Sequence, residues 1–238
     1  MRNNAPSALI TGASRGIGRA IALKLAEQGC KLLLNARTAA DLQALRSLIT
    51  SRYPDAQVTV VAADLQRHEE LDALIEQFRE VEPAPYLLIN NVGIFQPGPL
   101  LQDPPGRLEQ MMQLNVYAAY HLVRAFVPAM VERGSGHVFN ICSVASREAF
   151  ADRGAYVITK HALLGLSRAL RAEVAHTGVR VSAILPGPTA TSSWSEAEKP
   201  VDKQLMPPED IASMLWAAYQ LSDDSVAEEI VLRPKGWA

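Results

Sequence analysis

Cysteine is scarce in this chain, and long hydrophobic runs are absent. The 238 residues include two cysteines, Cys30 and Cys142, far apart and in apolar surroundings, so we expect neither a disulfide framework nor a thiolate metal site. No run approaches the roughly 18 apolar residues of a membrane span. Residues 1–6 also lack the apolar region of a secretory signal. We therefore expect a cytoplasmic protein that does not bind membranes.

An excess of charge of one sign is lacking as well. Lys and Arg number 23 against 25 Asp and Glu, which gives a formal net charge of −2. Such a balance provides no positive field for nucleic acid or anionic lipid, so we expect neither partner. The five histidines show no metal-ligand spacing, and we predict no metal site.

Strand-like and helical stretches alternate along the whole chain. No linker, repeat or low-complexity segment divides it, and 48% hydrophobic residues are enough for a large core. Alternation of this kind is typical of strands covered by helices on both faces. We predict one α/β domain over residues 1–238, with a doubly wound, mostly parallel sheet flanked by helices.

A glycine-rich turn follows the first apolar run. Residues 7–11 are mostly apolar, Gly12, Gly16 and Gly18 follow, and apolar positions then recur at helical spacing as far as Gly29. Glycine accepts positive φ and lets the backbone approach a pyrophosphate, and free N–H groups at a helix start favour negative charge. The turn is predicted to bind the phosphates of a nucleotide, although a tight strand-to-helix turn needs similar glycines.

A tyrosine and a lysine stand four residues apart in a long helical pattern. Tyr156 and Lys160 lie within residues 155–174, so both side chains leave the same helix face. An ammonium beside a phenol favours the ionised phenol, which suits a proton donor that works near neutral pH. Such a pair alone is common on protein surfaces. In combination with the glycine turn, it indicates a proton donor beside a nucleotide-binding site.

These two motifs resemble those of the short-chain dehydrogenase/reductase family, and the resemblance covers nearly the whole chain. It implies a Rossmann-like fold and hydride transfer between a nicotinamide and a carbonyl carbon. It also implies that Ser143 binds the carbonyl oxygen and that Tyr156 protonates it. Lys160 would bind the nicotinamide ribose, and Asn115 would hold a water that resupplies the proton. The predicted catalytic residues are therefore Asn115, Ser143, Tyr156 and Lys160.

The same resemblance assigns a set of cofactor contacts. Asp64 follows the apolar run 58–61 and would lie near the adenine, unless it only caps a helix that starts near Arg67. Residues 90–93 match the family's Asn-Asn-Ala-Gly apart from Val92, and residues 186–191 resemble its carboxamide-binding turn. The predicted cofactor-binding residues are Gly12, Ser14, Arg15, Gly16, Ile17, Gly18, Arg37, Asp64, Leu65, Asn91, Gly93, Tyr156, Lys160, Pro186, Gly187, Thr189 and Thr191.

No acidic residue ends the predicted second strand. Dinucleotide folds that prefer NAD usually carry an acid there, which binds the ribose 2′-hydroxyl and repels a 2′-phosphate. Ala36 stands at this position, Arg37 follows it, and Arg15 lies in the glycine turn. Hydrogen bonds from charged groups are worth about 1.5–3 kcal/mol each. We therefore predict NADP(H) as the cofactor, unless both arginines are merely solvated.

Loops after the predicted strands are expected to hold the substrate. The predicted contacts are Phe95, Ala145, Phe150 and Trp194, the last within a substrate loop at about 188–207. Trp194 could stack on a planar ring or anchor a lid. Residues 36–42, Trp194 and the tail 206–234 look similar to bacterial sepiapterin-reductase-type members. We accordingly favour a pteridine side-chain ketone such as sepiapterin.

Alternative functions stay open at this point. The protein could reduce another small ketone or a 3-oxoacyl thioester. The thioester would be presented by an acidic carrier protein, so that function needs basic residues beside the pocket, for which the candidates are Arg147, Arg153, Arg168 and Arg171. A non-catalytic NADP(H) sensor would have no need of Tyr156.

The predicted helices 107–131 and 155–174 look apolar on more than one face. The family uses these helices for a two-fold interface, so we expect a homodimer or homotetramer. Burial within one subunit would give a similar pattern.

Overall fold

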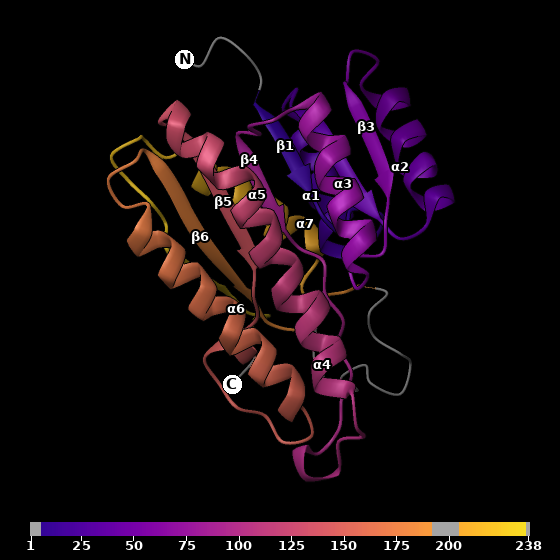
Figure 1. Cartoon of the computed structure of the whole chain (residues 1–238), viewed down its shortest axis with the longest axis vertical. Coiled ribbons are helices and arrows are strands. Elements are labelled where there is room, and N and C mark those ends of the chain that lie inside the picture. Colours follow the sequence, from indigo (N-terminus) through magenta and orange to yellow (C-terminus); the bar gives the residue numbers. More distant parts are fainter. Residues whose placement is uncertain (1–5, 192–204, 237–238) are drawn as a thin grey trace.

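Seven parallel strands form the centre of the molecule (Figure 1). The computed structural model describes residues 6–191 and 205–236. Its strands are β1 (Ser7–Ile10), β2 (Lys31–Ala36), β3 (Val58–Ala62), β4 (Leu87–Asn90), β5 (Gly136–Ile141), β6 (Val179–Pro186) and β7 (Glu229–Leu232). Every neighbouring pair runs parallel. The predicted doubly wound α/β sheet is thus confirmed, and it is wholly parallel over the described residues.

Helices form most connections between successive strands, as a parallel sheet requires. They are α1 (Gly16–Glu27), α2 (Ala39–Arg52), α3 (His68–Val81), α4 (Arg107–Met112), α5 (Ala118–Arg133), α6 (Gly154–Glu173) and α7 (Pro208–Tyr219). Three short turns of other helix types are η1 (Leu100–Gln102), η2 (Gln113–Tyr117) and η3 (Val144–Ser146).

The order of the strands places a crevice at the middle of the sheet. The strands lie in the order β3-β2-β1-β4-β5-β6-β7, so the chain winds outward from β1, returns to β4 and winds outward in the opposite direction. Ile10, at the end of β1, is paired with Leu34 on one side and with Ile89 on the other. Ligands of such sheets bind outside the carboxyl ends of the strands at this reversal point.

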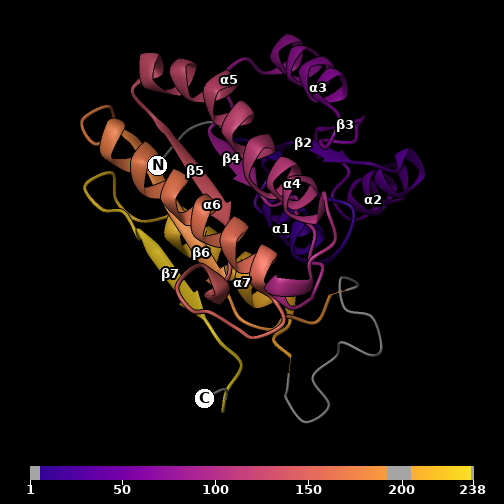
Figure 2. The same cartoon turned by 60° about the horizontal axis from the view of Figure 1, so that its bottom comes forward.

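Both faces of the sheet are buried. Successive residues of a strand point to opposite faces, so Ala8 and Ile10 join one hydrophobic core while Leu9 joins the other. Helices α1, α2 and α7 cover the first face, and α3, α5 and α6 cover the second (Figures 1 and 2). Burial of apolar area, at about 25 cal/mol per Å², is therefore available on both sides of each central strand.

The predicted helix 107–131 is not one regular helix. It is divided into α4 and α5 by the π-helical turn η2, and α5 continues to Arg133. A π turn inserts one residue into the helical ladder, often at a functional site. The apolar periodicity hardly changes across such a turn, so the sequence pattern does not reveal it. The predicted helix 155–174 agrees with α6 within one residue at each end.

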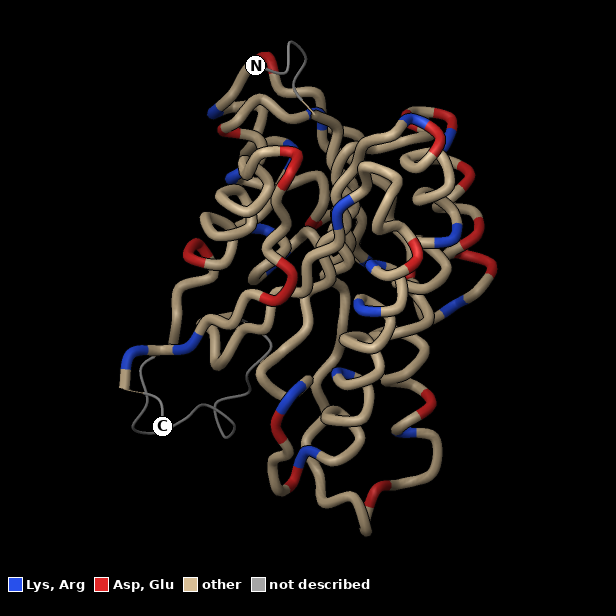
Figure 3. Tube along the Cα trace, turned by 90° about the vertical axis from the view of Figure 1, so that its left-hand side faces the viewer, with Lys and Arg blue, Asp and Glu red and all other residues tan. Residues whose placement is uncertain are grey.

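Basic and acidic residues are interspersed along the described trace (Figure 3). In residues 6–191 and 205–236, no helix is long and apolar enough to cross a membrane. The same residues contain no group of three or more His, Cys, Asp or Glu side chains that could hold a metal ion.

Candidate active site

The glycine-rich turn joins the end of β1 to the start of α1. Gly12 and Gly16 have φ of 62° and 53°, a conformation that favours glycine. A Cβ on Gly18 would lie 2.2 Å from the carbonyl oxygen of Gly12, so no larger residue fits there without a shift of the backbone. The turn is therefore held tightly against the first turn of α1.

Asn91 fastens this turn to the end of β4. Its side-chain amide donates to the carbonyl oxygens of Thr11 (2.9 Å) and Gly12 (3.1 Å). The Thr11 hydroxyl accepts from the backbone N–H groups of Asn91 (3.0 Å) and Val92 (3.1 Å). The two central strands are thus locked together at the edge where their carboxyl ends meet.

A pocket with a volume of about 300 Å³ lies along these strand ends. It is lined by all but four of the residues predicted to bind cofactor, substrate or the reacting carbonyl. The glycine turn and the predicted carboxamide turn both line it and lie close together, since a Cβ on Gly16 would lie 3.1 Å from Cγ2 of Thr191. Segments separated by about 170 residues along the chain therefore meet at one site.

The four exceptions are Gly18, Asp64, Asn115 and Trp194. Gly18 lies behind the glycine turn, and its contribution is steric. The Asp64 carboxylate accepts from the backbone N–H of Gln66 (3.1 Å) in the turn before α3, so its observed role is the local one, while Leu65 lines the pocket. Trp194 lies outside the described residues.

Two arginines line the end of the pocket beside β2. Arg15 is the N-cap residue of α1, and Arg37 follows the last residue of β2, Ala36. Both are exposed, and neither forms an ion pair with another described residue. Thr38 and Asp41, at the start of α2, also line this end. Neither was predicted from the sequence to bind the cofactor, although Thr38 precedes a helical pattern as N-cap residues do.

Tyr156 and Lys160 point into the pocket from α6. The Lys160 ammonium is 5% exposed, lies 5.7 Å from the centre of the Tyr156 ring and donates to the Ile141 carbonyl oxygen (2.9 Å). No carboxylate among the described residues pairs with it. A Cβ on Gly93 would lie 3.0 Å from the side-chain oxygen of Asn115, so a larger residue here would press on that side chain.

Ser143 lies at the end of β5, where it caps the short helix η3. Its hydroxyl oxygen accepts from the Ala145 N–H (3.1 Å), and its own N–H donates to the Ser146 hydroxyl (3.2 Å). A serine hydroxyl has one proton and two lone pairs. No hydrogen bond among the described residues uses the proton, so it is available to an acceptor in the pocket.

Asn115 lies in η2, is 1% exposed and contacts α6. Its oxygen accepts from the Ile94 N–H (2.8 Å), and its nitrogen donates to the Ile94 carbonyl (3.0 Å) and the Thr159 hydroxyl (3.0 Å). The side chain thus ties the loop after β4 to α6. It holds the frame of the site together and does not enter the pocket itself.

The far end of the pocket is aromatic. The Phe95 and Tyr156 rings meet edge to face with their centres 4.9 Å apart. Ala145 and Phe150 line the same end, as predicted residues of the substrate loops. Arg153 lines it too, a placement that the sequence could not give because it depends on the path of the loop before α6.

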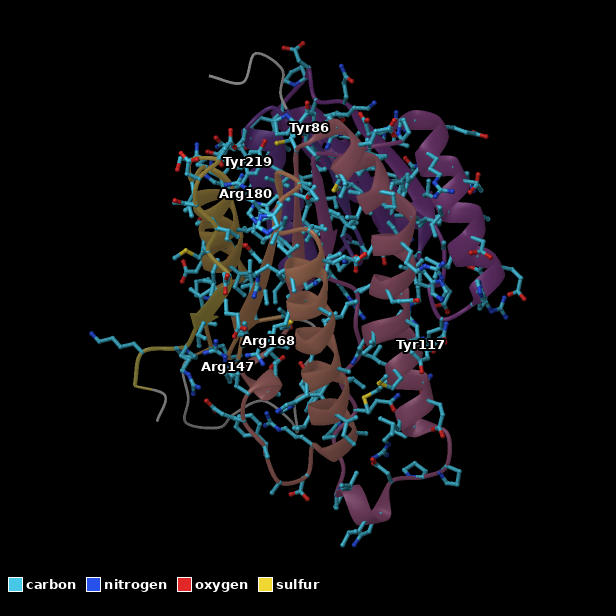
Figure 4. The ribbon with its side chains drawn as sticks, turned by 60° about the vertical axis from the view of Figure 1, so that its left-hand side comes forward. Tyr86, Tyr117, Arg147, Arg168, Arg180 and Tyr219 are labelled. Atoms are coloured by element: carbon cyan, nitrogen blue, oxygen red, sulfur yellow. The ribbon has the colours of Figure 1, made fainter. Side chains whose placement is uncertain are left out.

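The remaining basic candidates are occupied elsewhere. Arg168 donates to Glu229 (2.8 Å), Arg147 donates to the same carboxylate (3.0 Å), and Arg171 pairs with Glu228 (3.4 Å). Figure 4 shows Arg147 and Arg168 close together beside β7. These hydrogen bonds, with that of Arg168 the largest, lower the pKa of Glu229 from its usual 4.5 to about 2.

Neither thiol suits nucleophilic chemistry. Burial raises the pKa of Cys30 to about 12 and also raises that of Cys142, the residue before Ser143. The thiolate is the reactive form of cysteine. Both residues therefore act as small core side chains, as the sequence predicts.

Comparison with known proteins agrees with this geometry. Sepiapterin reductase from Chlorobaculum tepidum is 32% identical over 237 residues, which covers 95% of this chain and 95% of that protein. A metagenomic short-chain oxidoreductase solved in complex with NADP is 31% identical, with a TM-score of 0.84 and 98% of each chain covered. L-Sorbose reductase from Gluconobacter frateurii, solved with NADPH and L-sorbose, is 26% identical, with a TM-score of 0.88 and 96% and 95% covered.

The short chain dehydrogenase family model matches residues 6–202. This range includes the glycine turn, the predicted catalytic residues and every strand except β7. The chain therefore belongs to the short-chain dehydrogenase family of NAD(P)-dependent oxidoreductases.

Proposed function

We propose that this protein reduces a ketone to an alcohol with NADPH. The observation that carries the proposal is the position of Ser143, Tyr156 and Lys160 at one end of a pocket whose other end is a glycine turn flanked by two arginines. One end of the pocket offers an acid and a hydrogen-bond donor, and the other end offers an anion site. This arrangement suits a dinucleotide that lies along the strand ends.

The residues fit NADPH. The backbone of residues 12–18 would hold the pyrophosphate, because glycine leaves its N–H groups open to it. Arg15 and Arg37 would bind the 2′-phosphate, and the small Ala36 leaves room for it. NADP and NADPH are the ligands in the two solved structures described above. Bound NADPH supplies a hydride to the carbonyl carbon.

The chain's own residues supply the proton and the orientation. Ser143 donates its free proton in a hydrogen bond to the carbonyl oxygen, which fixes the ketone. Tyr156 transfers its phenolic proton to that oxygen as the C–H bond forms, so that the ketone becomes an alcohol. The Lys160 cation stabilises the resulting phenolate. Asn115 holds the loop after β4 and α6 at a fixed spacing throughout.

For the substrate, we propose the side-chain ketone of a pteridine such as sepiapterin. Phe95 and Phe150 provide flat apolar surfaces at the substrate end, which suit a planar ring. The relative at 32% identity is a sepiapterin reductase. A thioester on an acidic carrier protein is the weaker candidate, because three of the four candidate arginines, Arg147, Arg168 and Arg171, are engaged in ion pairs within the chain. Of the four, Arg153 alone lines the pocket.

We also propose that the protein forms a homodimer or homotetramer through α5 and α6. Large apolar side chains stay exposed on and next to these helices, namely Tyr120 (42%) on α5, Ile158 (39%) on α6 and Tyr117 (46%) at the end of η2. Figure 4 shows Tyr117 at the outer side of the helix layer. Light scattering after size exclusion tests this directly. Charged substitution of Tyr120 should favour the monomer, and a monomeric wild-type protein would end the proposal.

A substrate panel tests the reaction and the substrate together. NADPH oxidation is followed by absorbance with sepiapterin, a short 3-oxoacyl thioester and a simple diketone. We expect the highest kcat/KM with sepiapterin. A preference for the thioester would replace the pteridine by an acyl substrate, and a preference for the diketone would favour a general ketone reductase. Failure with all three, despite tight NADPH binding, would reject the catalytic proposal.

A further inference from the structure

Arg153 lies in the substrate end of the pocket between two aromatic rings. Its guanidinium carbon is 5.5 Å from the centre of the Phe95 ring and 5.4 Å from the centre of the Phe150 ring. Both distances are within the range of a cation–π interaction. The side chain is only partly exposed and lines the pocket, so its charge faces the space that a substrate would fill.

This guanidinium has no protein counter-ion among the described residues. The carboxylate of Glu148 is paired with Arg233, and that of Glu229 is paired with Arg147 and Arg168. In the described lining of the pocket, the one acidic side chain is Asp41, at the opposite end beside β2. A partly buried cation is stable when a partner of opposite charge or an acceptor completes its hydrogen bonds. The pocket therefore presents to its ligand a guanidinium that has no carboxylate partner among the described residues.

The position of Arg153 is fixed relative to the proton donor. It is the N-cap residue of α6, three residues before Tyr156, and its carbonyl oxygen accepts from the Val157 N–H (2.9 Å). Its backbone also pairs with Gly98 in an isolated bridge. Phe95 contacts both the guanidinium and the Tyr156 ring. A substrate held by Arg153 would thus be aligned with the phenol.

We propose that Arg153 determines substrate specificity by binding a pair of acceptor atoms next to the ketone. The guanidinium offers two parallel N–H groups, which match two adjacent acceptors. Such a pair is present in the carboxylate of a 2-oxo acid, and also in the carbonyl oxygen on a pterin ring together with the neighbouring ring nitrogen. The inference rests on the proposed ketone reduction and names what the substrate must carry beside its carbonyl.

The test compares two aryl ketones that differ in charge. Phenylglyoxylate and its methyl ester share one ketone, and only the former carries the carboxylate. For Arg153→Met we expect KM for phenylglyoxylate to rise about tenfold or more, with kcat and the kinetics of the ester little changed. Arg153→Lys keeps the positive charge but lacks the two parallel N–H groups of the guanidinium. Its KM for phenylglyoxylate should therefore lie between those of the wild type and Arg153→Met. Arg46→Met, which removes an exposed arginine outside the pocket, is the matched control.

Sepiapterin distinguishes the two sources of the acceptor pair. If Arg153→Met raises KM for sepiapterin as well, the arginine binds the ring edge. If it raises KM for phenylglyoxylate alone, the arginine binds a carboxylate. Equal losses for the ester and both other ketones would show that Arg153 only supports the loop, and no loss for any of them would also overturn the proposal.

A binding experiment separates this inference from the proposed function. Titration of NADP⁺-loaded protein with phenylglyoxylate, followed by calorimetry, needs no turnover. Suppose that the protein reduces none of the ketones, but Arg153→Met weakens binding about tenfold or more. This result would support the proposed role of Arg153 in binding and reject the proposed reductase activity. If the protein is an active reductase and the substitution leaves binding unchanged, only the proposed role of Arg153 would be rejected.

Discussion

The side-chain amide of Asn115 donates a hydrogen bond of 3.0 Å to the hydroxyl of Thr159, the residue directly before Lys160. That hydroxyl in turn donates to the carbonyl oxygen of Tyr156 (2.9 Å). The π-helical turn η2 is thereby joined to the helical turn that carries both Tyr156, the proposed proton donor, and Lys160. Thr159 is fully buried, so water cannot replace this bond.

Substitution of Thr159 should test this link. Thr159→Val leaves the buried Asn115 N–H without an acceptor, so we expect the free energy of unfolding to fall by about 1–3 kcal/mol and turnover to fall with it. Thr159→Ser keeps the hydroxyl and should retain most of both. Urea denaturation and steady-state kinetics measure the two effects. A Val variant as stable and active as the Ser variant would show that the bond is not needed.

Gly18 should tolerate no side chain. In Gly18→Ala the new Cβ would lie 2.2 Å from the Gly12 carbonyl and 2.6 Å from the Asn91 amide nitrogen, so the turn must move and NADPH binding should be lost. Gly165→Ala is the control, because no atom lies within 4 Å of its Cβ and alanine stabilises a helix interior by about 0.5–1 kcal/mol. Fluorescence titration with NADPH would refute the account if the two variants bound equally well.

Arg37 should select the phosphorylated cofactor. In Arg37→Gln we expect KM for NADPH to rise about tenfold or more, through loss of charge-assisted hydrogen bonds to the 2′-phosphate. KM for NADH should not rise, because NADH lacks that phosphate. Arg46→Gln, on the exposed side of α2, controls for the loss of a surface charge. An equal rise in KM for NADPH and NADH would mean that Arg37 stabilises the loop conformation and does not bind the 2′-phosphate.

Glu229 should make stability depend on pH. Its pKa is lowered from 4.5 to about 2 in the folded protein, chiefly by the hydrogen bond from Arg168, so the folded state holds fewer protons than the unfolded state between those values. The contribution is complete above about pH 4.5 and is lost as the pH falls towards 2. Glu229→Gln should therefore lose less stability than the wild type between pH 5 and pH 3 in urea denaturation. Parallel pH profiles for the two proteins would disprove this role.

Much of this molecule can be predicted from local patterns. The strand-and-helix alternation gives the fold, and the glycine turn has the positive φ values that its sequence implies. Tyr156 and Lys160 share a helix face because that relation depends on four residues of one helix. The π turn at Asn115 is not predictable in this way, because contacts with the loop after β4 and with α6 stabilise it.

The substrate end is where sequence patterns are least informative. The placement of Arg153 between two rings depends on the loop that leads into α6, in which Asp152 has φ of 58°. The same limit applies to Asp64, whose carboxylate bonds within its own turn beside the pocket. Both outcomes depend on how loops pack in three dimensions, which apolar periodicity does not encode.

The proton donor is the central claim, and turnover by Tyr156→Phe tests it most directly. A positioned general acid contributes about 10²–10⁴-fold to the rate, so kcat for ketone reduction should fall by at least about 10²-fold while NADPH binding stays unchanged. Phenylalanine keeps the ring that packs against Phe95, so the pocket should retain its shape. Turnover near the wild-type rate in this variant would contradict the account.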